Sequence, residues 1–589
     1  MCHHLQTGAR RANQLFVNQG AGNDGIPVFR DMAPEYGIAD TSYSTNASFF
    51  DADNDGDLDL YVTVNMYDPQ MGPNAYWWDN DARYLVNVDR FYINEYDSLR
   101  GHPVYRDATT EAGILKGGFS LGMHVVDIDR DGWKDVYISN DYNSPDMLFM
   151  NNGDGTFTDR AGDFMKHTCY SAMGMNVADM NNDGRADIFV LDMLPEDNLR
   201  RKAMLQPFNY ISYVNNDRFG YTYQHVRNVL QMNQGVRPDN GDLSFLDVGL
   251  FAGIHATDWS WTPMLADFDN DQFRDLIITN GFPKDITDHD FSDYMTMRGN
   301  FIAPDVSLEL IPSVKLYNYA YRNELDSAGG IPRFTTVSRE WGITEPSFSS
   351  SAAYGDLDND GDLDYVINNI DDSASVFRNM LVEQGRGRSN WLKVHFTGGS
   401  GNPDGLGAIV EIFYDGQEQM WENNPYRGYH SSVQTGAHFG LGEVSRLDSL
   451  RVEWPGGKTQ TLRDVGVNAD LRLDWAEATS VPLVRKPAPE PLFSERGAEL
   501  GLDYLHPESD YIDYKVQRLL LHKLSQLGPG LAVSDVNGDG RDDLYLGGSH
   551  FHKGWFFLQQ ADGNFLEEGP AAGRGRRHQA GRRAGGVVF

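Results

Sequence analysis

The sequence contains little cysteine, no long apolar run and few basic residues. Cys2 and Cys169 are the only cysteines among 589 residues, which excludes a disulfide framework and a cysteine-rich zinc site. No apolar run approaches the ~18–20 residues that a membrane-spanning helix needs. Asp and Glu number 85 against 49 Lys and Arg, for a net charge of −36. This balance argues against nucleic-acid binding, because phosphate contacts require a basic surface.

The N-terminal segment MCHHLQTGARRANQ has no apolar stretch typical of a signal peptide, which taken alone favours the cytoplasm. The composition is that of a folded chain, with 40% apolar and 12% aromatic residues. The 61 glycines indicate many tight turns, and 589 residues exceed the length of one ordinary domain.

An aspartate-rich nonapeptide recurs six times along the chain. Every copy has an oxygen-bearing side chain at positions 1, 3 and 5 and an aspartate at position 9, and five of the six have glycine at position 6. We number the copies loop 1 to loop 6. They are DADNDGDLD from Asp51, DIDRDGWKD from Asp127, DMNNDGRAD from Asp179, DFDNDQFRD from Asp267, DLDNDGDLD from Asp356 and DVNGDGRDD from Asp535.

The segments around each loop predict β-structure. Short runs rich in Val, Ile, Leu and Tyr follow the loops, and alternating apolar and polar residues precede them, as expected for strands. A triplet led by Phe or Tyr, such as Phe29–Asp31 or Tyr105–Asp107, ends twenty positions before the first aspartate of five loops. A fixed offset indicates one supersecondary unit used repeatedly. Strand, metal loop, strand and a Phe-led strand predict one blade of a β-propeller, so the predicted fold class is all-β.

The loops predict metal sites, because clustered carboxylates repel one another. Each pair of charges 4 Å apart costs ~1 kcal/mol in water and several-fold more inside a protein. Alternating oxygen ligands with a backbone carbonyl at position 7 suit a hard cation, and the large anionic ligand set favours Ca²⁺ over Mg²⁺. We expect about one Ca²⁺ in each intact loop, up to six. The candidate residues at positions 1, 3, 5, 7 and 9 are Asp51, Asp53, Asp55, Asp57, Asp59, Asp127, Asp129, Asp131, Trp133, Asp135, Asp179, Asn181, Asp183, Arg185, Asp187, Asp267, Asp269, Asp271, Phe273, Asp275, Asp356, Asp358, Asp360, Asp362, Asp364, Asp535, Asn537, Asp539, Arg541 and Asp543.

Two other interpretations of the loops are less favoured. The loops could be acidic turns that are merely solvated, but this is disfavoured because the same pattern recurs six times with the same spacing. An EF-hand needs a bidentate Glu at position 12 and flanking helices. Position 12 is apolar in every copy, which excludes the EF-hand. The residues there are Val62, Ile138, Val190, Ile278, Ile367 and Leu546.

The six loops are not equivalent. Gln272 replaces glycine at position 6 of loop 4, where a sharp left-handed turn is required, so we expect strain and a doubtful affinity. Asn181 and Asn537 each remove one negative charge, which should weaken binding modestly. Asp57 and Asp362 stand at position 7, where the backbone supplies the ligand, so their side chains should add only to the electrostatic field.

The loops resemble those of FG-GAP/VCBS repeat propellers, the class that includes the integrin α-subunit head. Residues 389–475 show a second resemblance, to the ASPIC/UnbV domain of cartilage acidic protein-like and bacterial secreted proteins. The two resemblances imply a secreted or cell-surface calcium-binding protein without known catalysis. The motifs that carry the second resemblance are Asn390–Val394, Asn402–Ala408, His438–Gly442 and Val452–Gly457.

We expect four regions: an FG-GAP/VCBS propeller over 1–388, the ASPIC/UnbV domain over 389–475, a stiff proline-rich linker over 476–492, and the start of a second propeller over 493–589. Both ends resemble interrupted repeats, so N-terminal blades are expected to be missing. The segment GRGRRHQAGRRAGG is either a basic tail for RNA or a frame-shifted reading of the next repeat, and we favour the second. If the sequence starts inside a repeat, the missing signal peptide says nothing about location, and a place outside the cell stays possible.

Three further features were weighed as sites. Gly118–Gly122 matches the G-x-S-x-G nucleophile pattern, but no helix is expected after it, and serine stands at the same place in four repeats, so Ser120 is interpreted as structural. Asp285, Asp288, His289 and Asp290 could hold a metal, although polar loops are common after strands. The aromatic clusters could stack on sugars or fill gaps between blades. They are Tyr76–Trp78 and Trp259–Trp261.

Two functions from different classes follow. The favoured one is a non-catalytic, calcium-stabilised extracellular interaction or adhesion protein that binds an unknown extracellular protein or polysaccharide. The alternative is a propeller enzyme acting on polysaccharide, a hydrolase or lyase, or a carbohydrate-binding module. The long insertions between loops, residues 64–103 and 192–243, are where we expect a binding surface.

Overall fold

The structure is a computed structural model. It describes residues 11–22, 24–66, 72, 74–78, 85–204, 210–298, 302–325, 327–385, 389–480, 492–509, 511–517, 520, 523–525 and 527–569. The arginine-rich segment, the last strand expected from the sequence and residues 481–491 of the expected linker lie outside this part of the chain. Residues 1–207 and 213–486 form one compact unit, and residues 208–212 with 487–589 form another, so each is described by itself.

The larger unit contains five antiparallel sheets, which we call blades 1 to 5, and each contains the loop of the same number. Every blade keeps its strands in sequence order, as the repeat predicts. Blade 1 is β3 (Ser44–Phe50), β4 (Asp59–Val64), β5 (Arg90–Asp97) and β6 (His102–Asp107); blade 2 is β7 (Ser120–Val126), β8 (Asp135–Asn140), β9 (Met147–Asn151) and β10 (Phe157–Asp159); blade 3 is β12 (Met175–Ala178), β13 (Asp187–Val190), β15 (Val229–Val236) and β16 (Leu243–Asp247); blade 4 is β17 (Ser260–Ala266), β18 (Asp275–Asn280), β20 (Tyr319–Asn323) and β21 (Phe334–Thr336); blade 5 is β23 (Ser349–Gly355), β24 (Asp364–Asn369) and β25 (Ser375–Phe377).

Each loop joins the first two strands of its blade, so the strands predicted on both sides of the loops are confirmed. The apolar residue at position 12 lies in a strand in every copy, and this context excludes the EF-hand. The first strands of the blades lie side by side in the order β3, β7, β12, β17 and β23. The fold is all-β, and closure of the blades into a ring stays a prediction.

Apolar side chains from neighbouring blades pack against one another and form the core. Between blades 1 and 2, for example, Tyr61 and Phe91 meet Met123, Val136 and Phe149, all of them almost completely buried. Burying side chains of this size stabilises the fold by about 1.5–3 kcal/mol each. The packing therefore makes each blade depend on the next.

An asparagine in or just after the third strand joins each of blades 2 to 5 to the loop of the preceding blade. The side-chain amide of Asn151 in blade 2 donates to the carbonyl of Ala52 in loop 1 at 2.8 Å. The same contact, from the third strand of one blade to position 2 of the preceding loop, recurs three more times at 2.7–3.1 Å. These contacts pair Asn233 with Ile128, Asn323 with Met180 and Asn379 with Phe268.

We expect Asn151→Ala to lower the free energy of unfolding by about 1–3 kcal/mol, because buried carbonyls lose their donor. The carbonyls concerned belong to Ala52 and Lys134. Urea unfolding followed by tryptophan fluorescence measures the change. Asn152→Ala, at the exposed neighbouring residue, is the control and should stay within about 0.5 kcal/mol of the wild type. Equal effects of the two variants would contradict this role for Asn151.

Residues 389–480, which we call the second domain, add two more sheets and a short hairpin to the larger unit. The first sheet has the order β31-β26-β34 and the second β28-β27-β32-β33. Their apolar faces share a cluster that includes Val410, Phe439, Leu450 and Trp454. The strands are β26 (Asn390–Thr397), β27 (Ile409–Tyr414), β28 (Gln417–Glu422), β31 (Ala437–Gly442), β32 (Arg446–Glu453), β33 (Thr459–Gly466) and β34 (Ala469–Asp474), and the hairpin is β29 (Tyr426–Arg427) with β30 (Ser431–Ser432).

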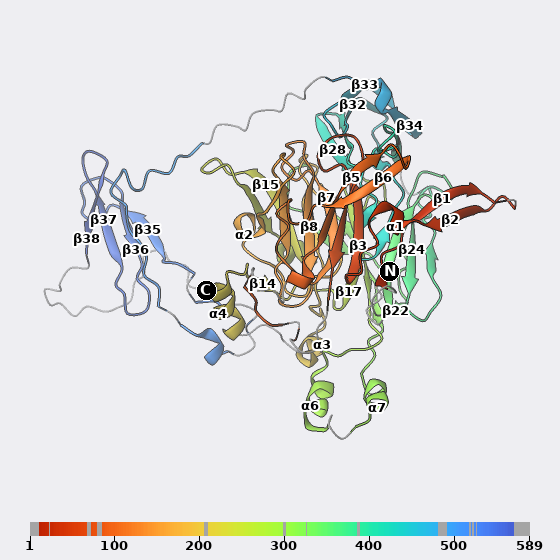
Figure 1. Ribbon diagram of the computed structural model, residues 1–589. Helices are drawn as coiled ribbons and strands as arrows, with labels where there is room; N and C mark the ends of the chain where they lie inside the picture. Colours follow the sequence, from red (N-terminus) through yellow and green to blue (C-terminus); the bar gives the residue numbers. More distant parts are fainter. Residues whose placement is uncertain are drawn as a thin grey trace. The chain divides into compact units, whose positions relative to one another are not determined.

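The helices are short and lie in connections. The three longest connections, residues 65–89, 191–228 and 281–318, each run from a second strand to a third and therefore leave the blades at the end opposite the loops. Figure 1 shows α6 and α7 at that end and β28 and β33 of the second domain at the other. None of the described helices is both long and apolar enough to cross a membrane. The helices are α1 (Ala33–Tyr36), α2 (Ala161–Phe164), α3 (Asn198–Ala203), α4 (Tyr210–Phe219), α5 (Gly249–Ala252), α6 (His289–Arg298) and α7 (Pro304–Glu309).

Three small sheets complete the larger unit, and one sheet forms the other unit. The sheet of the other unit is antiparallel in the order β35-β36-β37-β38. Loop 6 joins its first two strands, the same place that the loop takes in each blade. The small sheets pair β1 (Phe16–Ala21) with β2 (Pro27–Asp31), β11 (Thr168–Cys169) with β14 (Gln224–His225), and β19 (Leu316–Tyr317) with β22 (Pro346–Ser347); the separate sheet is β35 (Leu531–Ser534), β36 (Asp543–Leu546), β37 (Trp555–Gln559) and β38 (Phe565–Glu568).

Candidate metal centres

All six loops close through the same hydrogen bonds. In each, the N–H of position 6 donates to Oδ2 of the aspartate at position 1, at 2.8–3.1 Å. The N–H of position 7 donates to Oδ1 of the aspartate at position 5, also at 2.8–3.1 Å. Positions 4 and 6 both have positive φ in every loop. This double left-handed turn curls the chain and brings the side chains of positions 1, 3 and 5 toward one centre.

The aspartate at position 9 is tied to the backbone in every loop. Its Oδ2 accepts the N–H of position 2 and its Oδ1 accepts an N–H from the third strand of the same sheet, all at 2.8–3.1 Å. A carboxylate has about four lone-pair sites, so these oxygens can still approach a cation. Position 9 therefore fixes the loop and remains a possible ligand.

Four of the loops bring three carboxylates together. Within each group, one oxygen from every residue lies within 4.8 Å of the others. Among the described residues, loops 3 and 6 form no such group of three carboxylates, because asparagine stands at position 3. The groups are Asp51, Asp53 and Asp55 in loop 1; Asp127, Asp129 and Asp135 in loop 2; Asp267, Asp269 and Asp271 in loop 4; and Asp356, Asp358 and Asp360 in loop 5.

Several buried oxygens at the ligand positions have no hydrogen-bond partner, and this indicates whether a cation would fit there. Buried polar atoms normally have a hydrogen-bond partner, and leaving one unpaired costs about 1–3 kcal/mol. Five such oxygens stand at positions 1, 3 or 5 of loops 1 to 5, one in each loop, and a cation would satisfy them. They are Asp51 Oδ1, Asp127 Oδ1, Asn181 Oδ1, Asp269 Oδ1 and Asp360 Oδ2.

The cost of keeping the loop carboxylates charged is visible in their pKa values. Burial, with the charges of Asp55 and Asp53, raises the pKa of Asp51 to about 7. Burial likewise raises the pKa of Asp59 to about 8. In loop 4, burial and the charge of Asp269 raise the pKa of Asp271 to about 7. A positive charge at these centres would offset both the burial and the repulsion.

Basic side chains already neutralise part of the charge in loops 3 to 6. Arg185 Nη2 lies 2.5 Å from Asp183 in loop 3, and Arg541 donates to Asp539 at the same two positions of loop 6. In loop 5, Lys393 from the second domain contacts Asp356. Burial raises the pKa of Asp356, but the hydrogen bonds from Lys393 and the Gly361 N–H outweigh it and lower this pKa.

Loop 1 differs from those four. In the part of the chain that the structure describes, no basic side chain forms an ion pair with any of its five aspartates, and Asp53 and Asp55 are exposed. The charge of loop 1 is thus uncompensated. We expect it to hold a cation more tightly than loops 3 to 6.

Gln272 in loop 4 has φ 92°, close to the values of 78–99° for the glycines at position 6 of the other loops. A side chain in this region strains the backbone by about 1–3 kcal/mol. Gln272→Gly should therefore raise the free energy of unfolding by about 1 kcal/mol, measured by urea unfolding. The reverse change Gly184→Gln in loop 3 is the matched control and should destabilise. Destabilisation by Gln272→Gly would contradict the expected strain.

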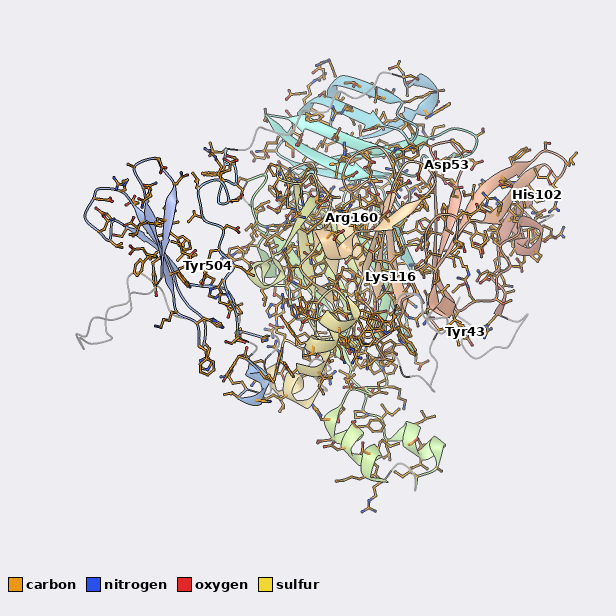
Figure 2. All side chains as sticks on the ribbon, turned by 60° about the vertical axis from the view of Figure 1, so that its left-hand side comes forward. Tyr43, Asp53, His102, Lys116, Arg160 and Tyr504 are labelled. Atoms are coloured by element: carbon orange, nitrogen blue, oxygen red, sulfur yellow. The ribbon has the colours of Figure 1, made fainter. Side chains whose placement is uncertain are left out.

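The second domain lies over the loops of the blades. Asn54 Oδ1 in loop 1 accepts the N–H of Gly456 at 3.1 Å. In loop 2, Lys134 Nζ lies 2.6 Å from Glu422 Oε1, and both side chains are buried. Figure 2 shows Asp53 of loop 1 at the end of the blades that carries this domain. Further contacts are Arg130 Nη2 to Glu411 Oε1 at 2.8 Å, Arg274 Nη2 to the Met420 carbonyl at 2.5 Å, the Gly442 N–H to the Asn270 carbonyl at 2.8 Å, and Lys393 with Asp356.

A hairpin of the second domain, β29–β30, reaches the first strands of four consecutive blades. Asn424, just before it, donates to the carbonyl of Val125 in β7 at 2.8 Å. The Gly428 N–H donates to the Met175 carbonyl of β12 at 2.8 Å, and the Tyr429 N–H donates to Thr262 Oγ1 of β17 at 3.1 Å. Ser431 Oγ accepts the Ala352 N–H of β23 at 3.1 Å. The blades and the second domain are therefore built together as one unit.

With this geometry in view, two comparisons with protein families decide the identity of the repeats. Residues 127–190, from the start of loop 2 to the end of β13, match the family described as FG-GAP-like repeat. Residues 398–480 match the family described as ASPIC and UnbV. The chain thus contains a region similar to the FG-GAP-like repeat and a region similar to the ASPIC/UnbV domain. Both resemblances inferred from the sequence are confirmed.

Curated relatives extend the similarity over most of the chain. It is 24% identical to cartilage acidic protein 1 of Xenopus tropicalis over 444 residues, or 74% of this chain and 56% of that protein. The human protein of the same name is 24% identical over 426 residues, or 72% of this chain and 52% of that protein. The chain spans about half the length of the curated relatives it matches.

Solved structures align only weakly. A lectin of Agrocybe aegerita that recognises non-reducing terminal N-acetylglucosamine is 15% identical, covers 63% of this chain and 92% of its own, and has a TM-score of 0.23. The biofilm matrix protein Bap1 of V. cholerae is 9% identical, covers 77% of this chain and 62% of its own, and has a TM-score of 0.25. At these scores neither alignment informs the function of this protein.

The serine of the G-x-S-x-G match is a structural residue. Ser120 is fully buried at the start of β7, and its Oγ donates to Asp89 Oδ2 and Asn140 Oδ1, each at 3.2 Å. The serines at the same place in three other FG-GAP-like repeats also begin the first strand of their blades. No nucleophile is exposed at this position.

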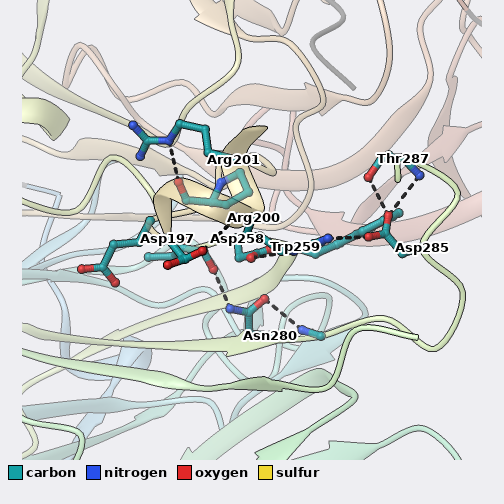
Figure 3. Close-up of polar contacts among 12 residues, drawn as sticks. Asp197, Arg200, Arg201, Asp258, Trp259, Asn280, Asp285 and Thr287 are labelled. Carbon is teal, nitrogen blue, oxygen red and sulfur yellow. Dashed lines mark hydrogen bonds and ion pairs between the residues drawn. The ribbon is translucent and has the colours of Figure 1, made fainter. Parts of the chain in front are cut away.

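In the acidic cluster near residue 285, Asp285 and Asp288 have structural partners, and Figure 3 shows those of Asp285. Asp285 is fully buried and lies 2.5 Å from Arg200 Nη1, while Arg200 Nε lies 3.0 Å from Asp258. Asp288 accepts the N–H of Phe291 at 2.9 Å, next to the start of α6 at His289. Among the described residues, these side chains form no group with metal-ligand spacing.

The aromatic clusters differ in exposure. Trp259 and Trp261 are buried. Trp259 stacks on Phe282 at a centroid distance of 4.6 Å and Trp261 lies tilted against it at 5.5 Å, and both tryptophans belong to the core shared by blades 3 and 4. Trp78 is 51% exposed and lies over Phe219 at 4.6 Å. Of the two clusters, only Tyr76–Trp78 exposes a ring to solvent.

Residues outside the predicted ligand set also build the loops. Asparagine at position 4 of loops 1, 3 and 4 donates to the position 6 carbonyl of the next loop at 3.0–3.1 Å. Its repetition was visible in the sequence. Glu383, in contrast, lies close to Asp360 and Asp362 in space, and nothing in its sequence context indicates this. Asp362 itself accepts the N–H of Val382 at 3.1 Å, which ties the turn after β25 to loop 5.

Proposed function

We propose that this chain is an extracellular interaction protein whose blade loops bind Ca²⁺ as a structural ion. The observation that carries the proposal is the set of buried, unpartnered oxygens at ligand positions of loops 1 to 5. Four of these loops also gather three carboxylates within 4.8 Å. The FG-GAP-like repeats and the similarity to cartilage acidic protein 1 support an extracellular setting.

In each site, positions 1, 3 and 5 would supply side-chain oxygens, position 7 its carbonyl and position 9 a further carboxylate. An anionic all-oxygen set of this size suits Ca²⁺, and ligand sets of extracellular modules bind it with dissociation constants of ~0.1–1 mM. Such an affinity keeps the loops filled outside a cell and largely unfilled in the cytoplasm. A location outside the cell is therefore part of the proposal.

The ions would stabilise the loops on which the ASPIC/UnbV domain packs. That domain contacts loops 1, 2, 4 and 5 directly, so ordered loops are needed for its docking. We propose that an extracellular protein or polysaccharide binds at the opposite end of the blades, where the connections 65–89, 191–228 and 281–318 lie. We propose a non-catalytic role, because Ser120 and Asp285 are both buried in structural contacts.

Isothermal titration calorimetry of the EDTA-treated full chain tests the proposal. Ca²⁺ should bind with a midpoint of ~0.1–1 mM, and Mg²⁺ should bind more weakly. Asp51→Asn should reduce the affinity of loop 1, whereas Asp415→Asn, in the exposed β27–β28 turn, should leave the isotherm unchanged. Absence of any Ca²⁺ uptake by the folded wild type would contradict the proposal.

A further inference from the structure

A second acidic group stands beside loop 5. One oxygen each of Asp360, Asp362 and Glu383 lies within 4.8 Å of the others. Of these residues, only Asp360 belongs to the group formed by positions 1, 3 and 5 of the loop. Loop 5 therefore contains two overlapping groups of carboxylates that share one residue.

Asp362 makes this group more than an exposed acidic patch. Its side chain belongs to a residue that is 1% exposed, and one oxygen, Oδ2, accepts the N–H of Val382 at 3.1 Å. The other oxygen, Oδ1, is buried and has no hydrogen-bond partner, and the same holds for Oδ2 of Asp360. Asp362 is buried and Asp360 is half-buried, and each carboxylate keeps one buried oxygen that has no hydrogen-bond partner in the described protein.

The chain after β25 places the third ligand. The Leu381 N–H donates to Asn379 Oδ1 at 3.1 Å, and the Val382 N–H is held by Asp362, so the turn folds back onto the loop. Glu383 follows directly and reaches the carboxylates. The hydrogen bond from Val382 therefore fixes both the orientation of Asp362 and the position of Glu383.

Charge at this group is only partly compensated. Arg378 lies 2.5 Å from Asp358 and also contacts Glu383, so one guanidinium serves two carboxylates. Lys393 contacts Asp356 on the other side of the loop. Neither base reaches the unpartnered oxygens, and two like charges 4 Å apart repel by ~4 kcal/mol at the effective dielectric of a protein surface.

Loop 1 provides an internal comparison. It has the same sequence as loop 5 at positions 3 to 9, including aspartate at position 7. Asp57 is only half-buried, and among the described residues it joins no second group of carboxylates. The second group is thus a property of loop 5 and its neighbour Glu383, and the repeat alone does not produce it.

We propose that loop 5 binds a second divalent cation, held by Asp362 and Glu383 and bridged through Asp360 to the ion of the loop. The ligands are hard oxygens, so the cation is of the Ca²⁺, Mn²⁺ or Mg²⁺ class. The inference rests on the proposed calcium binding of the loops and adds one site to it. The second ion would satisfy Asp362 Oδ1 and fix the turn after β25 to the loop.

Flow dialysis of the full chain with radioactive Ca²⁺ tests this inference by counting bound ions at saturation. Asp362→Asn keeps an oxygen for the Val382 N–H, and Glu383→Gln keeps the length of its side chain, so both variants should fold. Each should bind one ion fewer than the wild type. Asp371→Asn, in the exposed turn after β24, removes the same charge from the same blade and should keep the wild-type number.

Three outcomes are distinguishable. Loss of one ion by both Asp362→Asn and Glu383→Gln, with Asp371→Asn unchanged, supports the second site. Equal numbers of ions for all four proteins would overturn it while the calcium loops stand. No bound Ca²⁺ in any of them would refute the proposed function and the second site together. Melting curves of the variants show whether each remains folded.

Discussion

Removing calcium with EDTA is expected to lower the melting temperature of this protein by roughly 9 °C. At 2 mM Ca²⁺ and a dissociation constant of ~0.1 mM, each loop contributes about 1.8 kcal/mol through preferential binding to the folded state, or ~9 kcal/mol for loops 1 to 5. The entropy of unfolding of a unit of this size is ~1 kcal/mol per degree, which converts that free energy into the temperature shift. Differential scanning calorimetry with and without EDTA measures it.

The size of this effect follows from the loop chemistry. Without an ion, Asp51 and Asp127 keep buried oxygens with no partner. Adding back 2 mM Ca²⁺ should restore the melting temperature, whereas Mg²⁺ at the same ionic strength should restore less of it. A melting temperature that changes by less than ~1 °C under EDTA would mean that the loops are stable without calcium.

Breaking the buried ion pair between the blades and the ASPIC/UnbV domain should be the most damaging single substitution. Lys134 Nζ lies 2.6 Å from Glu422 Oε1, and the two side chains are 5% and 10% exposed. Lys134→Met leaves the charge of Glu422 buried and unpaired, which costs about 3–5 kcal/mol. Adding Glu422→Gln to this variant should restore much of the loss, because no charge then remains buried. Urea unfolding of the single and double variants measures the coupling.

An exposed pair supplies the control for this experiment. Arg30 and Glu35 are 2.8 Å apart, but their side chains are 64% and 38% exposed. Arg30→Met should change the free energy of unfolding by no more than about 1 kcal/mol. If Lys134→Met costs as little as Arg30→Met, the ion pair of Lys134 does not hold the ASPIC/UnbV domain on the loops.

The blades could be predicted because the loop and its flanking strands are local in sequence. Three sequence features depend on contacts within one repeat: the nine-residue loop motif, the apolar residue at position 12 and the Phe-led strand. Serines such as Ser120 could be interpreted correctly for the same reason, since their place recurs in four repeats. A repeated pattern makes each copy a check on the others.

The docking of the ASPIC/UnbV domain could not be predicted in this way. Lys134 and Glu422 are separated by 288 residues, and neither stands out from the many charged residues of the chain. The hairpin at Tyr429 is short and polar, and its role follows only from the four strands that it contacts. Glu383 likewise could not be assigned to the site from the sequence, because only the turn after β25 brings it close to Asp362.

Crystals of the full chain grown in millimolar Ca²⁺, with anomalous diffraction recorded at long wavelength, would show whether the blade loops bind calcium. We expect anomalous peaks within ~2.3–2.6 Å of the oxygens at positions 1, 3 and 5, and weaker peaks where asparagine replaces aspartate. Ordered loops without a peak in any blade would contradict calcium binding by the loops.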